Sequence, residues 1–294
     1  MQQIIHTDET MRETILHGTR DYPFKYYLED IYDFDLHCMD WHWHPELEFI
    51  SVVSGQATIY AGAQKYVLSP GQGIFINSQV IHRLEATEST VIPNIVFSPS
   101  LFAPTDSLIY KRYIEPVLES NMECYVFNPE ISWERNALDF LQNIFHEQEK
   151  ENPCELRTVN YLFDLWTVIY ENVGKSSLNT SNSASARDRG RLQIVLQYIH
   201  DNYQSELNLD ELAKKIAVSK SSLLTLFNSY VHVSPIEYVV HYRLSQAAIL
   251  LENTENTIQQ IAVSVGFNNE GYFCRKFKEV YKCTPGNYRK NKKQ

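Results

Sequence analysis

Hydrophobic and polar residues follow two different periods along the 294 residues of this chain. Between residues 20 and 100, short runs rich in β-branched and aromatic residues are separated by Gly, Pro and Asn, namely LEFISVVSG, QATIYAG, QKYVLSPGQG, IFINS and VIHRLEA. Runs of this length and spacing predict antiparallel strands in a sandwich or barrel. Further along the chain, apolar residues recur every three or four positions, which predicts helices.

Two amphipathic helices are predicted after the strands, over residues 131–150 and 155–173. The apolar stripe of the first consists of Leu138, Leu141, Ile144 and Phe145, and that of the second of Leu156, Val159, Leu162, Phe163, Trp166 and Ile169. Such a stripe has to be covered, either by the protein's own barrel or by a second copy of the chain. The pattern therefore leaves packing on the barrel and dimerisation as alternatives.

The stretch GKSSLNTSNSASARDRG, residues 174–190, is rich in Ser and Asn and holds almost no large apolar side chain, which is typical of a flexible linker. The balance of charge changes at the same place. Residues 1–188 hold 12 Lys and Arg against 27 Asp and Glu, whereas residues 189–294 hold 14 against 9. A basic C-terminal part favours contact with a polyanion, although a solvated basic face would have the same composition.

The overall composition, with 44% hydrophobic and 21% charged residues, is that of a soluble globular protein. No run approaches the ~18 apolar residues of a membrane-spanning helix, and the first residues lack the basic and apolar regions of a secretion signal. The five cysteines form no CxxC pair, so we expect reduced thiols rather than a disulfide framework. These features predict a cytoplasmic protein with no membrane partner.

The C-terminal part repeats itself: LDELAKKIAVSKSSLLTLF, residues 209–227, corresponds to IQQIAVSVGFNNEGYFCRKF, residues 258–277. Each copy predicts a helix-turn-helix unit, whose second helix enters the major groove of DNA. Ser219 and Asn269 are the predicted N-caps of the second helices. Between the copies, SPIEYVVHYRLSQAAILLENT predicts one long helix that would hold the two recognition helices about one DNA turn, ~34 Å, apart. The side chains predicted to lie in the core are Phe227, Phe273 and Phe277.

Residues 191–290 resemble the DNA-binding domain of the AraC/XylS family of bacterial transcription regulators. RLSQAAILL corresponds to part of the long helix in that family, and IAVSVGFNNEGYFCRKFKEVYKCTPGNYRK corresponds to the signature around its second helix-turn-helix unit. The resemblance implies double-stranded promoter DNA as a partner, RNA polymerase as a further partner, and activation as the commoner mode of regulation.

Several positions depart from the family pattern. Thr225 stands where the first recognition helix usually has an arginine, Asn228 replaces a lysine, and His232 and Lys282 replace turn glycines. Because threonine lacks the fork with which arginine contacts guanine, we expect the second recognition helix to contribute more affinity. For each single position, an exposed residue without a DNA contact is the alternative. The predicted DNA-binding residues are Lys220, Ser221, Ser222, Leu224, Thr225 and Asn228 in the first unit, and Asn269, Glu270, Gly271, Cys274, Arg275 and Lys278 in the second.

WHWHPELEFISVVSG, residues 41–55, resembles the entry strand of the cupin-like barrel that effector-sensing members of the family carry, and residues 66–84 resemble its return strands. Together they fit the general cupin metal pattern. Alternation along a strand places the His and Glu side chains of the first run on one face, although Pro45 interrupts the strand. Three imidazoles and a carboxylate suit Zn²⁺, Fe²⁺ or Mn²⁺. The metal candidates are His42, His44, Glu48 and His82.

The same polar side chains fit two other roles, because they could hydrogen-bond a sugar or another small effector, or one another. We expect an organic effector rather than a resident cofactor. The predicted effector-binding residues are His42, His44, Glu46, Glu48 and His82. The chain has no GxSxG elbow, Gly-rich phosphate loop or cysteine motif, so no catalytic residue is predicted.

The sequence as a whole predicts an α+β protein of two domains. The expected organisation is a cupin-like antiparallel β-barrel that senses an effector (1–125), a helical dimerisation or packing segment (126–175), a linker (176–188) and an all-α DNA-binding domain (189–294). The expected function is a sequence-specific transcription regulator, an activator that acts as a homodimer and responds to a small molecule. The alternatives are a regulator whose barrel serves only dimerisation and a metal-dependent cupin enzyme fused to a DNA-binding domain.

Overall fold

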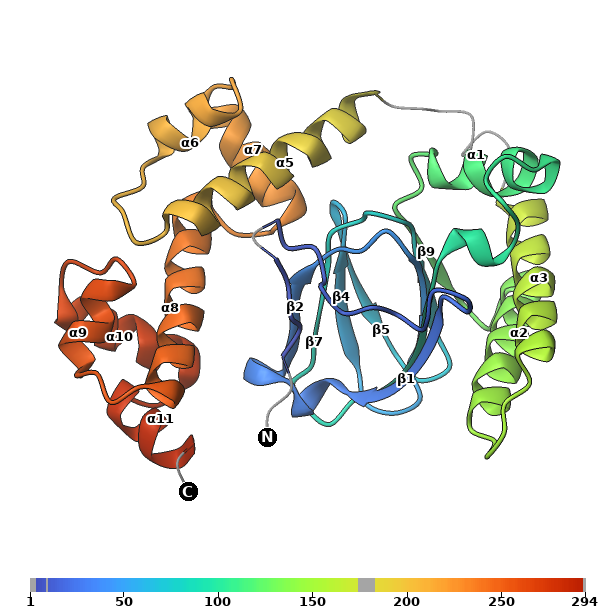
Figure 1. The fold of residues 1–294 in the computed structure, drawn as a ribbon, viewed down its shortest axis with the longest axis horizontal. Coiled ribbons are helices and arrows are strands. Elements are labelled where there is room, and N and C mark those ends of the chain that lie inside the picture. The colour runs from blue at the N-terminus through green and yellow to red at the C-terminus, as the bar shows by residue number, and fades with distance from the viewer. Residues whose placement is uncertain (1–3, 9, 174–182, 293–294) are drawn as a thin grey trace. The chain divides into compact units, whose positions relative to one another are not determined.

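The computed structural model describes residues 4–8, 10–173 and 183–292 and divides into two compact units (Figure 1). The first comprises Met1–Asp8 and Arg12–Ala186, and the second comprises Glu9–Met11 and Arg187–Gln294. All the strands that the structure describes belong to the first unit. Among the same residues, every helix is too short or too polar to cross a bilayer.

The strands of the first unit form two antiparallel sheets. One has the order β1-β8-β3-β6-β9 and the other the order β2-β7-β4-β5. The runs in which the pattern predicts strands contain β3 to β7, so the antiparallel prediction is confirmed. The strands are β1 (Phe24–Asp30), β2 (Cys38–His42), β3 (Leu47–Ser51), β4 (Ala57–Ala61), β5 (Gln64–Leu68), β6 (Gly73–Ile76), β7 (His82–Glu85), β8 (Val91–Phe97) and β9 (Cys124–Phe127).

Alternate side chains of β3 face opposite sides of its sheet. Phe49 packs with Phe75 and Phe97 in a core that the helices share, whereas Ile50 belongs to the apolar core between the sheets. Glu48 lies two residues before Ile50 and so faces the same interior. The interior of the barrel is therefore apolar around Ile50 and becomes polar toward Glu48.

The helices α2 (Ser132–Gln148) and α3 (Glu155–Asn172) cover the outer face of the first sheet (Figure 1). Their apolar stripes, apart from Leu156 and Val159, join the core around Phe49, so the structure has the packing arrangement of the two alternatives. Leu156 is an exception, because it is 72% exposed. The buried stripe of α3 begins at Thr158, and two residues turn a helix by about 200°, which places Leu156 on the opposite side. A short helix, α1 (Glu115–Leu118), precedes β9.

The predicted linker is only partly within the described residues. Residues 174–182 lie outside them, whereas the helix α5 (Ser183–Asn202) already includes residues 183–188. The linker prediction is therefore wrong for that part. Extending an existing helix costs much less than starting one, and alanine and arginine are good helix formers, so a Ser-rich composition did not keep these residues out of α5.

The second unit contains two helix-turn-helix units and one long helix between them, as the repeat predicts. The predicted core residues Phe227, Phe273 and Phe277 are fully buried. Ser219 and Asn269 cap the second helices as predicted, each by accepting a backbone N–H of the first turn. The helices after α5 are α6 (Leu209–Lys215), α7 (Lys220–Tyr230), α8 (Pro235–Asn253), α9 (Ile258–Ser264), α10 (Glu270–Tyr281) and α11 (Pro285–Lys292).

Candidate functional site

Four of the predicted barrel residues meet at the polar end of the interior. His42 ends β2, His44 lies in the turn before β3, Glu48 is on β3 and His82 begins β7. All four are at most 3% exposed. The ligand atoms of the three histidines lie within 4.8 Å of one another. The carboxylate of Glu48 approaches two of them, with 3.4 Å between Oε2 and Nε2 of His44 and 3.1 Å between Oε2 and Nε2 of His82.

Backbone carbonyls orient two of the imidazole rings. Nδ1 of His42 lies 2.7 Å from the carbonyl oxygen of Asp40, and Nδ1 of His82 lies 2.9 Å from that of Val80. A carbonyl oxygen only accepts, so each Nδ1 carries the proton and donates. The Nε2 atom of both rings is then left with a lone pair in the neutral imidazole. Metal-binding histidines are held in this way, because the outer hydrogen bond fixes the tautomer and the ring orientation.

Several buried polar atoms of this cluster have no hydrogen bond. These buried atoms without a hydrogen-bond partner are Nδ1 of His44, Oε2 of Glu48 and Nε2 of His82. Buried polar atoms are seldom left unsatisfied, so such a group calls for an explanation. A divalent cation bound by three imidazoles and one carboxylate would satisfy Oε2 of Glu48 and Nε2 of His82, whereas Nδ1 of His44 is on the side of its ring that faces Glu46. The donor set is one that Zn²⁺, Fe²⁺ and Mn²⁺ accept. The residues present thus fit a metal ion.

The electrostatics of the cluster agree with a carboxylate among imidazoles. Burial alone would raise the pKa of Glu48, but the adjacent imidazoles of His44 and His82 outweigh it and hold this pKa below its usual range. Burial, together with the neighbouring His82, lowers the pKa of His42 to about 3. His42 is therefore neutral at physiological pH and available as a ligand.

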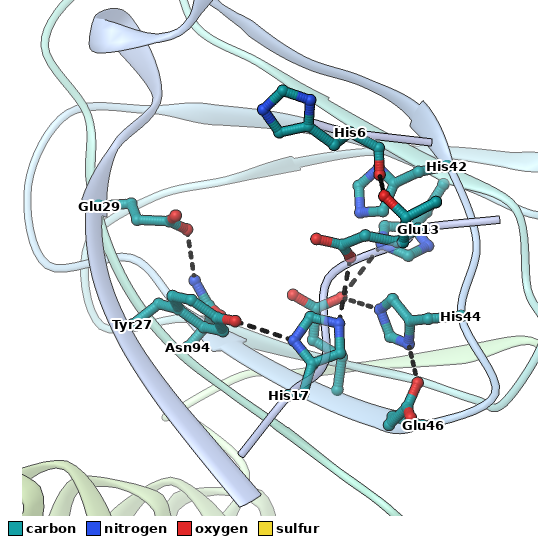
Figure 2. A network of polar contacts seen from close by, with 12 residues as sticks. His6, Glu13, His17, Tyr27, Glu29, His42, His44, Glu46 and Asn94 are labelled. Atoms are coloured by element: carbon teal, nitrogen blue, oxygen red, sulfur yellow. Dashed lines mark hydrogen bonds and ion pairs between the residues drawn. The ribbon is translucent and has the colours of Figure 1, made fainter. Parts of the chain in front are cut away.

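Glu46 occupies a different position from the other predicted residues. It lies at the edge of the cluster, where its side chain is 20% exposed and its Oε2 is 3.8 Å from Nδ1 of His44. The structure thus brings His42, His44, Glu48 and His82 together and leaves Glu46 at the rim (Figure 2).

Five residues that the sequence did not indicate also line this region: Glu13, His17, Tyr27, Glu29 and Asn94 (Figure 2). Asn94 donates a hydrogen bond of 3.0 Å to Glu29, and burial raises the pKa of Glu29 to about 7 despite this bond. Tyr27 and Glu29 are on β1 and Asn94 is on β8, two strands that lie outside the predicted runs. Glu13 and His17 come from a segment without a regular hydrophobic pattern. Their residue types, which can bind a metal or a polar ligand, were therefore the only signal in the sequence.

The recognition helix of the first helix-turn-helix unit is α7. Its predicted DNA-binding residues are exposed, except Leu224, which is half-buried. Lys220, however, forms an ion pair of 2.7 Å with Asp210 of α6. A lysine that is already paired with a carboxylate has less to gain from a phosphate, so the first unit offers few cationic contacts.

The second recognition helix, α10, holds more basic residues than α7, although its two glutamates give it the same net charge. Its predicted residues are exposed, with Cys274 half-buried. Among the residues that the structure describes, Arg275 and Lys278 form no ion pair, whereas Lys276 pairs with Glu279 at 2.6 Å. The guanidinium of Arg275 lies 5.4 Å from the ring centroid of Tyr272, an exposed residue outside the predicted set. This helix therefore presents two free cations and an aromatic ring.

Comparisons with known proteins agree with both parts of the chain. Residues 39–93 match the cupin domain family, and residues 212–291 match a helix-turn-helix domain family. The chain is 26% identical over 285 residues to an uncharacterized HTH-type transcriptional regulator, YdeC, of Bacillus subtilis, an alignment that covers 96% of this chain and 97% of the relative. It is 24% identical over 249 residues to the HTH-type transcriptional activator RhaS of Mannheimia succiniciproducens, covering 83% of this chain and 87% of that protein.

Among solved structures, ToxT from Vibrio cholerae aligns with 90% of this chain and 97% of its own, at 16% identity and a TM-score of 0.42. The sequence relatives that span most of the chain carry names of transcriptional regulators, and the two domain matches lie where the structure has its antiparallel sheets and its duplicated helix-turn-helix unit. These matches agree with the resemblance to transcriptional regulators of the AraC type, with an N-terminal cupin domain and a C-terminal helix-turn-helix domain.

Proposed function

We propose that this regulator binds promoter DNA through α7 and α10 and that a ligand in the polar cluster of the barrel controls the binding. The observation that carries the DNA-binding part is the duplicated unit, in which two capped recognition helices expose their N-terminal residues while their phenylalanines form the core. Such helices enter the major groove and read base edges.

The free cations of α10 support an unequal division of work between the two helices. Arg275 would contact bases or phosphates and Lys278 a phosphate, whereas Thr225 on α7 offers a single hydroxyl. We expect Arg275→Ala to weaken the binding of promoter DNA by at least about fivefold, since a good arginine contact contributes ~1–3 kcal/mol. Lys276→Ala is the matched control, because Lys276 is on the same helix but is paired with Glu279.

Fluorescence anisotropy with DNA from upstream of the regulator's own gene and of neighbouring genes measures both variants. Equal affinities of the wild type, Arg275→Ala and Lys276→Ala on a DNA that binds specifically would refute the assignment of α10. Specific binding to none of these DNAs, in a genome-wide selection as well, would refute the DNA-binding function itself.

For the controlling ligand, the geometry favours a divalent cation. His42, His44, Glu48 and His82 would hold it, and the two carbonyl-bonded rings support this because their Nε2 atoms are free of protons in the neutral form. A bound cation would supply positive charge to the buried carboxylate and a rigid link between β2, β3 and β7. Metal analysis of chelator-free protein is the direct test, with one ion per chain expected in the wild type and none in His82→Ala.

A small organic effector, including a sugar, is the second candidate occupant. Tyr27, Glu29 and Asn94 favour it, because they add hydroxyl, carboxylate and amide groups beside the histidines. Titration of the promoter complex with cations and with a panel of sugars separates the candidates. A change with a sugar alone supports the organic effector. No change with any ligand supports a barrel that serves only contacts between proteins.

Further properties follow from a regulator of this kind and are also proposals. We infer that it acts in the cytoplasm as a homodimer, and that it contacts RNA polymerase as an activator. Sedimentation of the full chain with and without promoter DNA tests the dimer. Reporter transcription from a bound promoter, with and without the protein, distinguishes activation from repression.

A further inference from the structure

The N-terminal segment reaches into the histidine cluster. Glu13 donates its backbone N–H to the carbonyl oxygen of Trp43 at 2.9 Å, which places it beside the turn that carries His44. Its side chain is 8% exposed, and that of His17 is 3% exposed. Figure 2 shows both side chains pointing toward the same centre as His42 and His44. Residues about 25 positions upstream of the cupin motif thus share its interior.

His17, like His44 and His82, has a buried ring nitrogen without a hydrogen bond. Its Nδ1 lies 2.9 Å from the hydroxyl of Tyr27. Its Nε2 is 3.3 Å from Oε2 of Glu13 but is buried without a hydrogen bond. Its ring lies 5.4 Å from that of His44, edge to face. His17 therefore adds one more buried nitrogen without a hydrogen bond to those of His44 and His82.

The charge of the cluster also calls for a cation. Glu48, which is buried, and Glu13, whose side chain is 8% exposed, are two carboxylates among four imidazoles. Burying carboxylates without full compensation is expensive, and a pair of them close together repel each other. One divalent cation would neutralise both.

We propose that Glu13 and His17 belong to the cation site together with His42, His44, Glu48 and His82, so that a bound divalent cation fastens residues 12–17 to the barrel. The set of four imidazoles and two carboxylates suits a first-row transition ion such as Mn²⁺, Fe²⁺ or Zn²⁺. The inference rests on the proposal that the cluster holds a cation, and it adds two residues and an ordered segment to that site.

Titration calorimetry of the full chain, first stripped with chelator, measures Zn²⁺ and Mn²⁺ binding. The variants Glu13→Gln and His17→Gln are expected to bind at least about 10-fold more weakly than the wild type, because each removes a donor and even the loss of an outer partner of a ligand costs ~10–100-fold in metal affinity. His6→Ala is the matched control, since His6 lies on the same segment but is exposed. Circular dichroism establishes that each variant is folded.

Hydrogen exchange of the peptide covering residues 11–18 is the second readout. In the wild type and in His6→Ala, the cation is expected to slow exchange of this peptide. In Glu13→Gln and His17→Gln it is expected to have no such effect, even at cation concentrations that restore full occupancy.

The outcomes separate the two proposals. Wild-type affinity in Glu13→Gln and His17→Gln, or unchanged exchange of the peptide on binding, overturns the role of the segment and leaves the four-residue site in place. Absence of binding by the wild type overturns both proposals. Weaker binding by the two variants but not by His6→Ala supports the inference.

Discussion

Gly266 lies in the tight turn between α9 and α10, where its φ is +90°. A Cβ at this position would lie 2.6 Å from the carbonyl oxygen of Tyr203 and 2.9 Å from both the carbonyl oxygen of Gln204 and Nε of Arg243. Two of these atoms are backbone and cannot swing away. We therefore predict that Gly266→Ala strongly destabilises the second helix-turn-helix unit.

The magnitude follows from two terms. A side chain in a left-handed conformation costs ~1–2 kcal/mol. The carbonyl oxygen that would be displaced accepts a 2.7 Å hydrogen bond from Nε of Arg243, whose Nη2 also donates to Ser205 at 2.7 Å. A hydrogen bond from a charged group contributes ~1.5–3 kcal/mol. Together these terms predict a loss of about 3 kcal/mol or more from the free energy of unfolding, a large part of the ~5–15 kcal/mol typical of a domain.

The tryptophans make the assay selective. All four, Trp41, Trp43, Trp133 and Trp166, belong to the first unit, so their fluorescence in a urea titration reports that unit. Far-UV circular dichroism reports the helices of both. Gly266→Ala is expected to shift a circular dichroism transition to lower urea while the fluorescence transition stays in place.

Gly286→Ala is the control for this substitution. Gly286 is in α11, its φ is not left-handed, and nothing lies within 4 Å of an added Cβ. Alanine there should be neutral or stabilising by up to ~1 kcal/mol, because it has the better helix propensity. If Gly266→Ala unfolds within about 1 kcal/mol of Gly286→Ala, the steric reasoning is wrong.

Two further predictions concern one position in each unit. Lys282 directly follows α10 as its C-cap, with a left-handed φ of 57°. Lys282→Gly should therefore raise the stability of the second unit by up to ~1 kcal/mol, measured in the circular dichroism transition, and a loss of stability would contradict this reasoning. Burial raises the pKa of Glu29 from 4.5 to about 7. Between these pH values, the folded cation-free protein keeps the proton of Glu29 whereas the unfolded protein loses it. The free energy of unfolding therefore falls as the pH rises from 4.5 to about 7. Glu29→Gln should remove up to about 3 kcal/mol of this decline, measured by tryptophan fluorescence in urea between pH 4.5 and 8; an unchanged pH dependence would show that Glu29 is not the group responsible.

The sequence alone determined the helical unit almost completely, because its evidence is local. The spacing of apolar residues, the caps Ser219 and Asn269 and the repeat itself all depend on neighbours within a few turns of the chain. The positions that depart from the family pattern also became meaningful in the structure. His232 and Lys282, which stand in place of turn glycines, both have a φ of 57°.

The sequence predicted only part of the barrel site. His42, His44 and Glu48 are close together along the chain, and His82 fits the cupin pattern, so the sequence is enough to group these four residues. The stripes of α2 and α3 showed that something covers them but not what, since an amphipathic face has the same composition whether it meets a sheet or a second copy of the chain.

Only the tertiary structure decided how the interior is completed. Tyr27 and Glu29 meet Asn94 because β1 pairs with β8, a register that joins residues more than 60 positions apart. Glu13 and His17 enter the cluster from a segment without periodicity. Contact between side chains that are far apart in the sequence depends on strand pairing and on the path of the backbone, which no short stretch of sequence encodes. These contacts complete the histidine motif as a buried site of imidazoles and carboxylates.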